Sequence, residues 1–75
     1  FQHLHLLLVD MTIDNEIKNV RQKRGLTQED LALAVAVSRQ TIVAMEKGNY
    51  VPSLMLAMQL AKYFKVPVEK LFYLK

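Results

Sequence analysis

Four consecutive polar residues, Ser38-Arg39-Gln40-Thr41, carry the side chains of this sequence best suited to reading nucleic-acid bases. An arginine can donate two hydrogen bonds to O6 and N7 of guanine, and a glutamine can pair with N6 and N7 of adenine. Such side chains must stand on an element that enters the major groove, as an α-helix does. Because an apolar stretch follows the four residues, we expect them to open a helix, with Ser38 as its N-cap.

This helix has one buried side and one outward side. Because each residue turns an α-helix by about 100°, Ile42 and Met45 lie within about 60° of each other and form the buried face. Gln40 and Ala44 lie nearly opposite that face. Arg39 stands in the first turn, from which side chains reach furthest toward base edges. The sequence therefore predicts that the first turn is presented to DNA.

Four further helices are expected to position this one. Gly25 and Pro67 indicate helix ends, since glycine favours the left-handed C-terminal position and a residue before proline disfavours the helical region. Thr27 can cap a helix whose acidic first turn suits the helix dipole. We expect helices over residues 14–24, 28–35, 39–46, 53–64 and 68–72, with a tight turn at 35–37 and a loop at 47–52. The second and third form a helix-turn-helix.

Apolar residues at helical spacing predict a single core to which all five helices contribute. The predicted core consists of Ile17, Val20, Leu26, Leu31, Val35, Val37, Ile42, Met45, Leu56, Leu60, Phe64 and Leu71. An exposed Ile42 or Met45 would contradict the predicted orientation of the third helix.

The composition favours a small globular domain. The chain has 75 residues, 52% of them hydrophobic, a net charge of +3 and no cysteine. A chain of this length forms one domain and buries a limited fraction of its surface, so it benefits from a partner subunit. The lack of cysteine excludes a disulfide framework, thiol catalysis and cysteine-ligated zinc, and it fits a cytoplasmic location. The modest positive charge suits an anionic partner without requiring one.

Residues 1–10 differ from the remainder and are interpreted as an N-terminal extension or tag remnant, with the DNA-binding domain over residues 11–75. The apolar run at 4–9 is far shorter than the ~20 residues that span a bilayer, and it lacks the features of a secretory signal. His3 and His5 could be a metal-binding pair. A flexible or strand-like end is the favoured interpretation, because no third ligand is evident, and we expect no metal site and no membrane contact.

The stretch from Asn15 to Phe72 resembles the Cro and phage-repressor-like helix-turn-helix family, also called the Xre family, and in particular its very short bacterial regulators. The resemblance is carried by separated motifs in the same order: Arg21, Gly25-Leu26-Thr27-Gln28, Leu31-Ala32, Val37-Ser38-Arg39-Gln40-Thr41-Ile42, Glu46-Lys47-Gly48 and Pro52-Ser53-Leu54. It implies an all-α, five-helix domain of the lambda-repressor type. A short β-ribbon between Met11–Ile13 and Phe72–Leu74 could be added to it.

By this resemblance, a set of polar residues would contact double-stranded DNA. Gln28 would hydrogen-bond a phosphate and brace the third helix, while Arg39 and Gln40 would be the main base readers. The whole set is Gln28, Ser38, Arg39, Gln40, Thr41, Lys47 and Asn49, of which the last two would hold backbone phosphates. Arg21 and Glu46 would form a structural ion pair between the first helix and the end of the third.

The sequence departs from the family pattern in two places. Ala36 stands in the turn where the family usually has glycine. A left-handed alanine is strained by ~1–2 kcal/mol, so the stability or the turn geometry should differ from that of relatives. Val43 and Ala44 occupy positions that are often polar, and they could contact thymine methyl groups instead of hydrogen-bonding bases.

These observations lead to the hypothesis of a sequence-specific transcriptional regulator, specifically a repressor, that binds a palindromic operator as a cytoplasmic homodimer. Dimerisation is expected through the C-terminal helix, because the apolar run at 71–74 remains after the core is filled.

Other interpretations stay open at this point. Arg39 and Lys47, taken alone, could be a solvated cationic face. The chain could also be an antitoxin or a protein-interaction adaptor on a helix-turn-helix scaffold, because a fold does not determine a function. An enzyme is not expected, since no nucleophile with a base, carboxylate pair or phosphate loop is visible. No cofactor or small-molecule ligand is implied.

Overall fold

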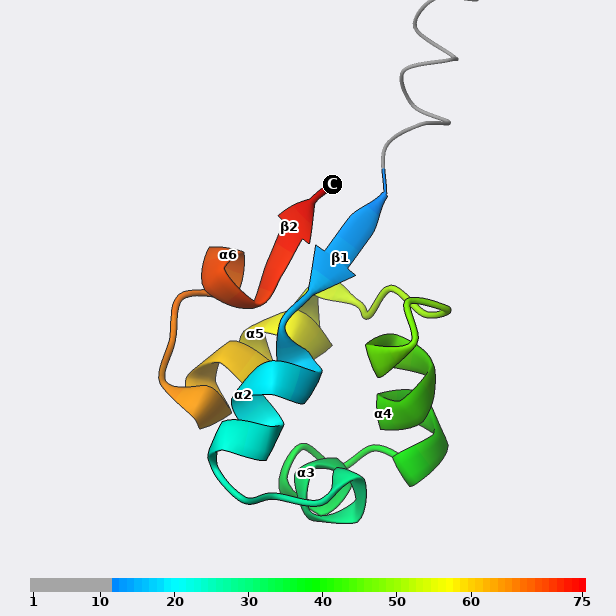
Figure 1. The fold of residues 1–75 in the computed structure, drawn as a ribbon, viewed down its shortest axis with the longest axis vertical. Helices are drawn as coiled ribbons and strands as arrows, with labels where there is room; N and C mark the ends of the chain where they lie inside the picture. The colour runs from blue at the N-terminus through cyan, green and yellow to red at the C-terminus, as the bar shows by residue number, and fades with distance from the viewer. Residues whose placement is uncertain (1–11) are drawn as a thin grey trace, which may run out of the picture.

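The computed structural model describes residues 12–75, which form five helices and two short strands (Figure 1). In chain order these elements are β1 (Ile13–Asn15), α2 (Ile17–Lys23), α3 (Gln28–Ala34), α4 (Arg39–Glu46), α5 (Leu54–Phe64), α6 (Val68–Leu71) and β2 (Phe72–Leu74). The two strands lie at one end of the molecule and α3 at the other, with α2 and α5 between them. The expected helical domain with a terminal ribbon is confirmed. The interpretations of residues 1–10, including the histidine pair, lie outside the described residues.

Side-chain caps determine where three of the helices begin. Thr27 Oγ1 accepts the Asp30 N–H at 3.0 Å, and the Asp30 carboxylate accepts the Thr27 N–H at 2.9 Å, which completes a capping box. The Thr27 N–H stabilises the charged carboxylate and so lowers the pKa of Asp30. Ser38 and Ser53 cap α4 and α5, each accepting at 3.1 Å the N–H three residues further on. These local signals account for the correct prediction that α3 begins at Gln28 and α4 at Arg39. α5 begins at Leu54, one residue after the predicted start, because Ser53 is its cap.

A two-stranded antiparallel ribbon joins the two ends of the described chain. Ile13 pairs with Leu74, and Asn15 pairs with Phe72. β2 covers the residues expected from the family resemblance, whereas β1 begins two residues later than the expected Met11–Ile13. The shift places Asn15, rather than an apolar residue, at the inner end of the ribbon.

The ribbon also corrects two predicted helix ends. α2 begins at Ile17 and not near Asp14, because Asp14 and Asn15 are strand residues. α6 ends at Leu71 and not at Phe72, because Phe72 is already extended, with φ −128° and ψ 136°. Both predictions were wrong for one reason: helical periodicity carries no information about a pairing between distant segments.

The core lies between the helices, and every residue predicted for it contributes. Ile42 and Met45 are fully buried, as the predicted orientation of α4 requires. Val20, Leu26 and Val37 are half-buried and pack against the edge of the core. α4 therefore rests on the core through one side and leaves its other side for a partner.

The turn between α3 and α4 decides between the two outcomes that the sequence left open for Ala36. Ala36 has a φ of 58°. The Val37 N–H donates to the Ala32 carbonyl at 3.0 Å and closes the turn. A non-glycine residue in this conformation is strained by ~1–2 kcal/mol. The turn thus keeps the left-handed geometry and bears the strain.

The apolar run at 71–74, which was expected to remain outside the core, is exposed only in part. Leu71 is fully buried and Phe72 is half-buried, so only the last two residues of the run at 71–74 are exposed. A larger apolar surface lies on α5, where Leu54, Met55 and Met58 are 73%, 69% and 57% exposed. We refer to these three residues as the α5 surface. None of the helices within residues 12–75 is long and apolar enough to cross a membrane.

Candidate nucleic-acid interface

The first turn of α4 presents two side chains that are free to contact a partner. Arg39 and Gln40 are exposed, and within residues 12–75 neither side chain makes a hydrogen bond. Ser38 and Thr41 are bonded to each other instead, with their hydroxyl oxygens 3.0 Å apart and the Ser38 oxygen also accepting the Thr41 N–H. Ser38 and Thr41 therefore act first as the cap of α4.

The second turn of α4 is less exposed than the first. Val43 and Ala44 are half-buried, although Ala44 was expected to lie nearly opposite the core. The part of the helix that offers polar groups to a partner is thus concentrated at Arg39 and Gln40.

Lys47 and Asn49 lie in the loop directly after α4. Both residues are exposed. The chain turns there at Gly48, whose φ of 81° is one that L side chains rarely adopt. The Asn49 N–H donates to the Ala44 carbonyl at 2.9 Å, which keeps the loop against the end of the helix. The two residues expected to hold phosphates are therefore next to the C-terminal end of α4, away from Arg39.

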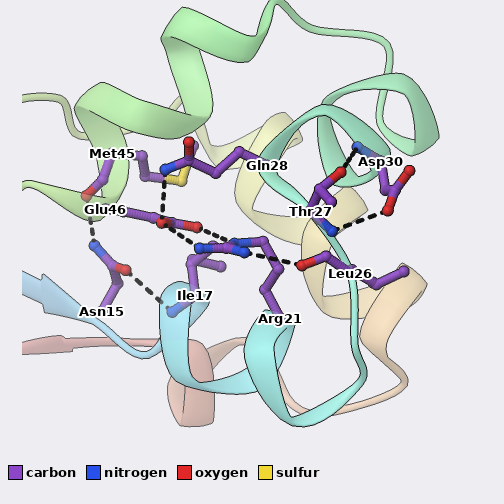
Figure 2. Close-up of polar contacts among 9 residues, drawn as sticks. All are labelled: Asn15, Ile17, Arg21, Leu26, Thr27, Gln28, Asp30, Met45 and Glu46. Carbon is purple, nitrogen blue, oxygen red and sulfur yellow. Dashed lines mark hydrogen bonds and ion pairs between the residues drawn. The ribbon is translucent and has the colours of Figure 1, made fainter.

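Arg21 of α2 and Glu46 of α4 meet beside the core (Figure 2). Arg21 Nε donates to Glu46 Oε2 at 2.6 Å, and Arg21 Nη2 donates to Glu46 Oε1 at 3.0 Å. The Arg21 side chain is 10% exposed and the Glu46 side chain 4%. The hydrogen bonds to Glu46 raise the pKa of Arg21, because they favour the charged guanidinium. Arg21 Nη1 also donates to the Leu26 carbonyl at 2.9 Å.

Gln28, the first residue of α3, joins the same carboxylate. Its Nε2 donates to Glu46 Oε1 at 3.1 Å, so α3 is tied to the end of α4 (Figure 2). A side-chain amide has a second N–H and a carbonyl oxygen for other partners. Gln28 is only half-buried, which leaves these groups within reach of a ligand outside.

Asn15 also holds α4, and sequence reasoning missed it. Its Nδ2 donates to the Met45 carbonyl at 2.9 Å, and its Oδ1 accepts the Ile17 N–H at 3.1 Å. The available signal was an asparagine before a helix, which predicts a local turn or cap. That signal does not reveal a partner 30 positions away.

Two helices joined by a tight turn, the second resting on the core with a polar first turn outward, have the geometry of a helix-turn-helix. The helix-turn-helix family HTH_3, which is of the Xre type, matches residues 17–71. The chain belongs to this family.

Relatives of this helix-turn-helix protein share most of its length. An HTH-type transcriptional regulator of Methanocaldococcus jannaschii is 55% identical over 58 residues, which cover 77% of this chain and 88% of the relative. The cryptic phage CTXphi transcriptional repressor RstR, from Vibrio cholerae, is 37% identical over 57 residues, covering 76% of this chain and 51% of the repressor.

A solved structure of a regulatory protein has a similar fold. The restriction-modification controller protein C.AhdI from Aeromonas hydrophila superposes with a TM-score of 0.68 and 25% identity, over 73% of this chain and 83% of the controller. The protein is accordingly a transcriptional regulator with a helix-turn-helix DNA-binding domain, related to repressors, and it is not an enzyme.

Proposed function

We propose that the protein is a repressor that binds a palindromic operator as a homodimer, with α4 lying in the major groove as the recognition helix. The observation that carries the proposal is the orientation of α4. Ile42 and Met45 are fully buried, while Arg39 and Gln40 stand exposed and unbonded within the described residues. A helix held in this way offers two side chains that can make bidentate contacts with guanine and adenine.

The remaining polar residues of the interface are assigned to the DNA backbone. Lys47 and Asn49 would hold phosphates on the side of α4 away from Arg39, and Gln28 would use the amide groups that Glu46 leaves unoccupied. Ser38 and Thr41, already paired at the cap, would lie close to the groove edge. Phosphate contacts fix the register of the protein on the duplex but carry no direct sequence information.

A second copy of the chain would pair through the α5 surface. Its three residues are more than half exposed, and no charged residue occurs between Gly48 and Ala61. Extended apolar surface without charge is typical of interfaces rather than of solvated helix faces. A two-fold dimer places two recognition helices on half-sites about 10 base pairs apart, which requires a palindromic operator.

Selection of bound sequences from a random duplex library at one stated salt concentration tests this proposal, because affinity depends steeply on salt. We expect enrichment of a palindrome, and no enrichment for the double variant Arg39→Ala/Gln40→Ala. Binding without enrichment of any sequence would overturn sequence-specific regulation. A stoichiometric protein partner found together with that result would favour the adaptor function instead.

A further inference from the structure

The last two residues of α4 are held by three other elements. The Glu46 carboxylate accepts hydrogen bonds from Arg21 of α2 and Gln28 of α3, and the Met45 carbonyl accepts one from Asn15 of β1 (Figure 2). All three contacts lie at the C-terminal end of α4. The exposed side chains of its first turn lie at the opposite end.

Asn15 differs from the other two donors because it belongs to the ribbon. It is the last residue of β1 and pairs with Phe72 of β2. The next residue, Glu16, donates its N–H to the Leu71 carbonyl at 2.9 Å. One amide side chain therefore connects the ribbon and the start of α2 with the end of α4. The Met45 carbonyl accepts the Gly48 N–H as well, at 3.0 Å, so the Asn15 amide fills its second acceptor position.

The position of the first turn of α4 depends strongly on the tilt of the helix, because the contacts that hold α4 lie at its other end. At a rise of about 1.5 Å per residue, Arg39 is about 9 Å along the helix from Met45. A change in tilt of about 10° at Met45 would move the first turn by roughly 1.6 Å, whereas binding groups need placement within about 0.5 Å. Contacts at the end of α4 thus influence which bases its first turn can reach.

We propose that Asn15 is a positioning residue for base recognition: by tying the Met45 carbonyl to the ribbon, its amide sets the tilt of α4. The inference rests on the proposed DNA binding by α4. Asn15 is not among the residues assigned to contact DNA, so sequence preference depends here on a side chain outside the interface.

Two substitutions separate this contact from the other roles of Asn15. Asn15→Asp keeps an oxygen that can accept the Ile17 N–H but replaces the donor to Met45 with a second acceptor, which the carbonyl repels. Asn15→Ser keeps a side-chain oxygen that can accept the Ile17 N–H, as serine does in such turns. The serine side chain is too short to reach the Met45 carbonyl. Val66→Ala is the control for lost stability, because Val66 is a half-buried residue at the edge of the core, between α5 and α6.

Residual dipolar couplings of the α4 amides, referred to an alignment tensor fitted on α5, report the tilt without DNA. Each variant is measured where circular dichroism shows it fully folded. We expect the α4 couplings to deviate in Asn15→Asp and Asn15→Ser but not in Val66→Ala. Unchanged couplings in both Asn15 variants would overturn the proposal.

Binding supplies the second measurement. We expect Asn15→Asp and Asn15→Ser to weaken binding to the selected operator about tenfold, the loss of roughly one base contact, and to change non-specific binding less than twofold. If both Asn15 variants preferred the operator over non-specific DNA as strongly as the wild type does, the positioning role of Asn15 would also be overturned. A wild-type protein that selects no sequence would instead defeat the proposed function, so the two failures are distinguishable.

Discussion

Glu46 receives two hydrogen bonds from the guanidinium of Arg21, at 2.6 and 3.0 Å, and the two side chains are only 4% and 10% exposed. Removing one partner from such a shielded pair leaves the other charge in the interior without compensation. The loss of unfolding free energy on replacing either residue therefore comes mainly from the buried charge that remains unpaired. It should far exceed the loss on breaking an exposed ion pair.

Glu46→Ala is expected to lower the free energy of unfolding by about 3 kcal/mol, measured by urea denaturation. The exposed pair between Lys75 and Asp14, 3.6 Å apart with 71% and 41% of the side chains exposed, is the control. Lys75→Ala should cost less than about 0.5 kcal/mol, since exposed pairs contribute little. A double-mutant cycle between Arg21→Ala and Glu46→Ala that gave no coupling energy would contradict the prediction.

Ala36→Gly is expected to stabilise the protein by about 1 kcal/mol, because glycine adopts the left-handed conformation without the strain that alanine bears there. The gain is smaller than the strain itself, since glycine also increases the entropy of the unfolded chain. Ala34→Gly, at the end of α3, is the matched control and should destabilise by about 0.5–1 kcal/mol. Thermal unfolding of both variants checks the opposite signs; a loss of stability in Ala36→Gly would refute the assignment of strain.

Arg39→Ala should flatten the selected operator at one symmetric pair of positions and cost about 1–3 kcal/mol of binding. Lys47→Ala should weaken binding to all sequences alike and reduce the salt dependence by about one counterion, as loss of a phosphate contact does. Lys47 is a better probe of the backbone than Gln28, whose amide also braces Glu46. If Arg39→Ala leaves the base preference intact, Gln40 becomes the principal reader.

Leu54→Glu should shift the protein from dimer to monomer, because it places two charges in a symmetric apolar contact. Leu33→Glu on α3 is the matched control, since Leu33 and Leu54 are 72% and 73% exposed. Light scattering at micromolar concentration without DNA measures both variants. A wild-type protein that is monomeric under these conditions, with or without operator, would rule out the proposed dimer.

Stability should depend on pH through Tyr73 and Glu16, whose side chains form a 2.7 Å hydrogen bond between β2 and the start of α2. The bond lowers the pKa of Glu16 and, by stabilising the protonated phenol, raises the pKa of Tyr73 to about 12. The Glu16 contribution is thus present above its ordinary value of 4.5 and is lost as the pH falls through the lowered pKa. The Tyr73 contribution is present below 10.0 and is lost as the pH rises toward 12.

Tyr73→Phe should remove the part of this dependence that the hydrogen bond between the two side chains causes, while the hydrogen bond from Asn19 continues to lower the pKa of Glu16. The difference in unfolding free energy between wild type and Tyr73→Phe is expected to be constant between about pH 4.5 and pH 10.0. It should shrink at lower pH, where Glu16 is protonated, and at higher pH, where Tyr73 loses its proton. Tyr63→Phe is the control, because Tyr63 is also 40% exposed and its hydroxyl makes no hydrogen bond within residues 12–75. A difference that does not change with pH would show that the hydroxyl and the carboxylate are not bonded in solution.

The features predicted correctly from sequence are those that neighbouring residues determine. Thr27 and Ser38 are followed within three residues by the N–H groups that they cap, and Ile42 and Met45 share a helix face whatever the tertiary structure. Short-range geometry sufficed in both cases. For Ala36, only the family resemblance, through the glycine usual at that position, pointed to a left-handed residue, which the structure shows.

Contacts between distant segments could not be predicted from the residues alone. Arg21 and Glu46 are 25 positions apart, and only the family resemblance linked them. No such link existed for Asn15 and Met45, or for the register of β1, because three-residue strands have no periodicity of their own. For Met55 and Met58 of the α5 surface the sequence leaves core packing and an interface both open, and only burial decides between them.

The ribbon bears on the order in which the chain folds. Its outermost pair, Ile13 with Leu74, is 61 positions apart, so closing the ribbon costs more chain entropy than joining α3 to α4 across four residues. During synthesis, α2, α3 and α4 are all made before the residues of β2. We therefore expect the helices to assemble first and Asn15 to reach its final place last, when β2 docks against β1. The final orientation of α4 is then a late event in folding, completed by a segment that is itself remote from α4 in sequence.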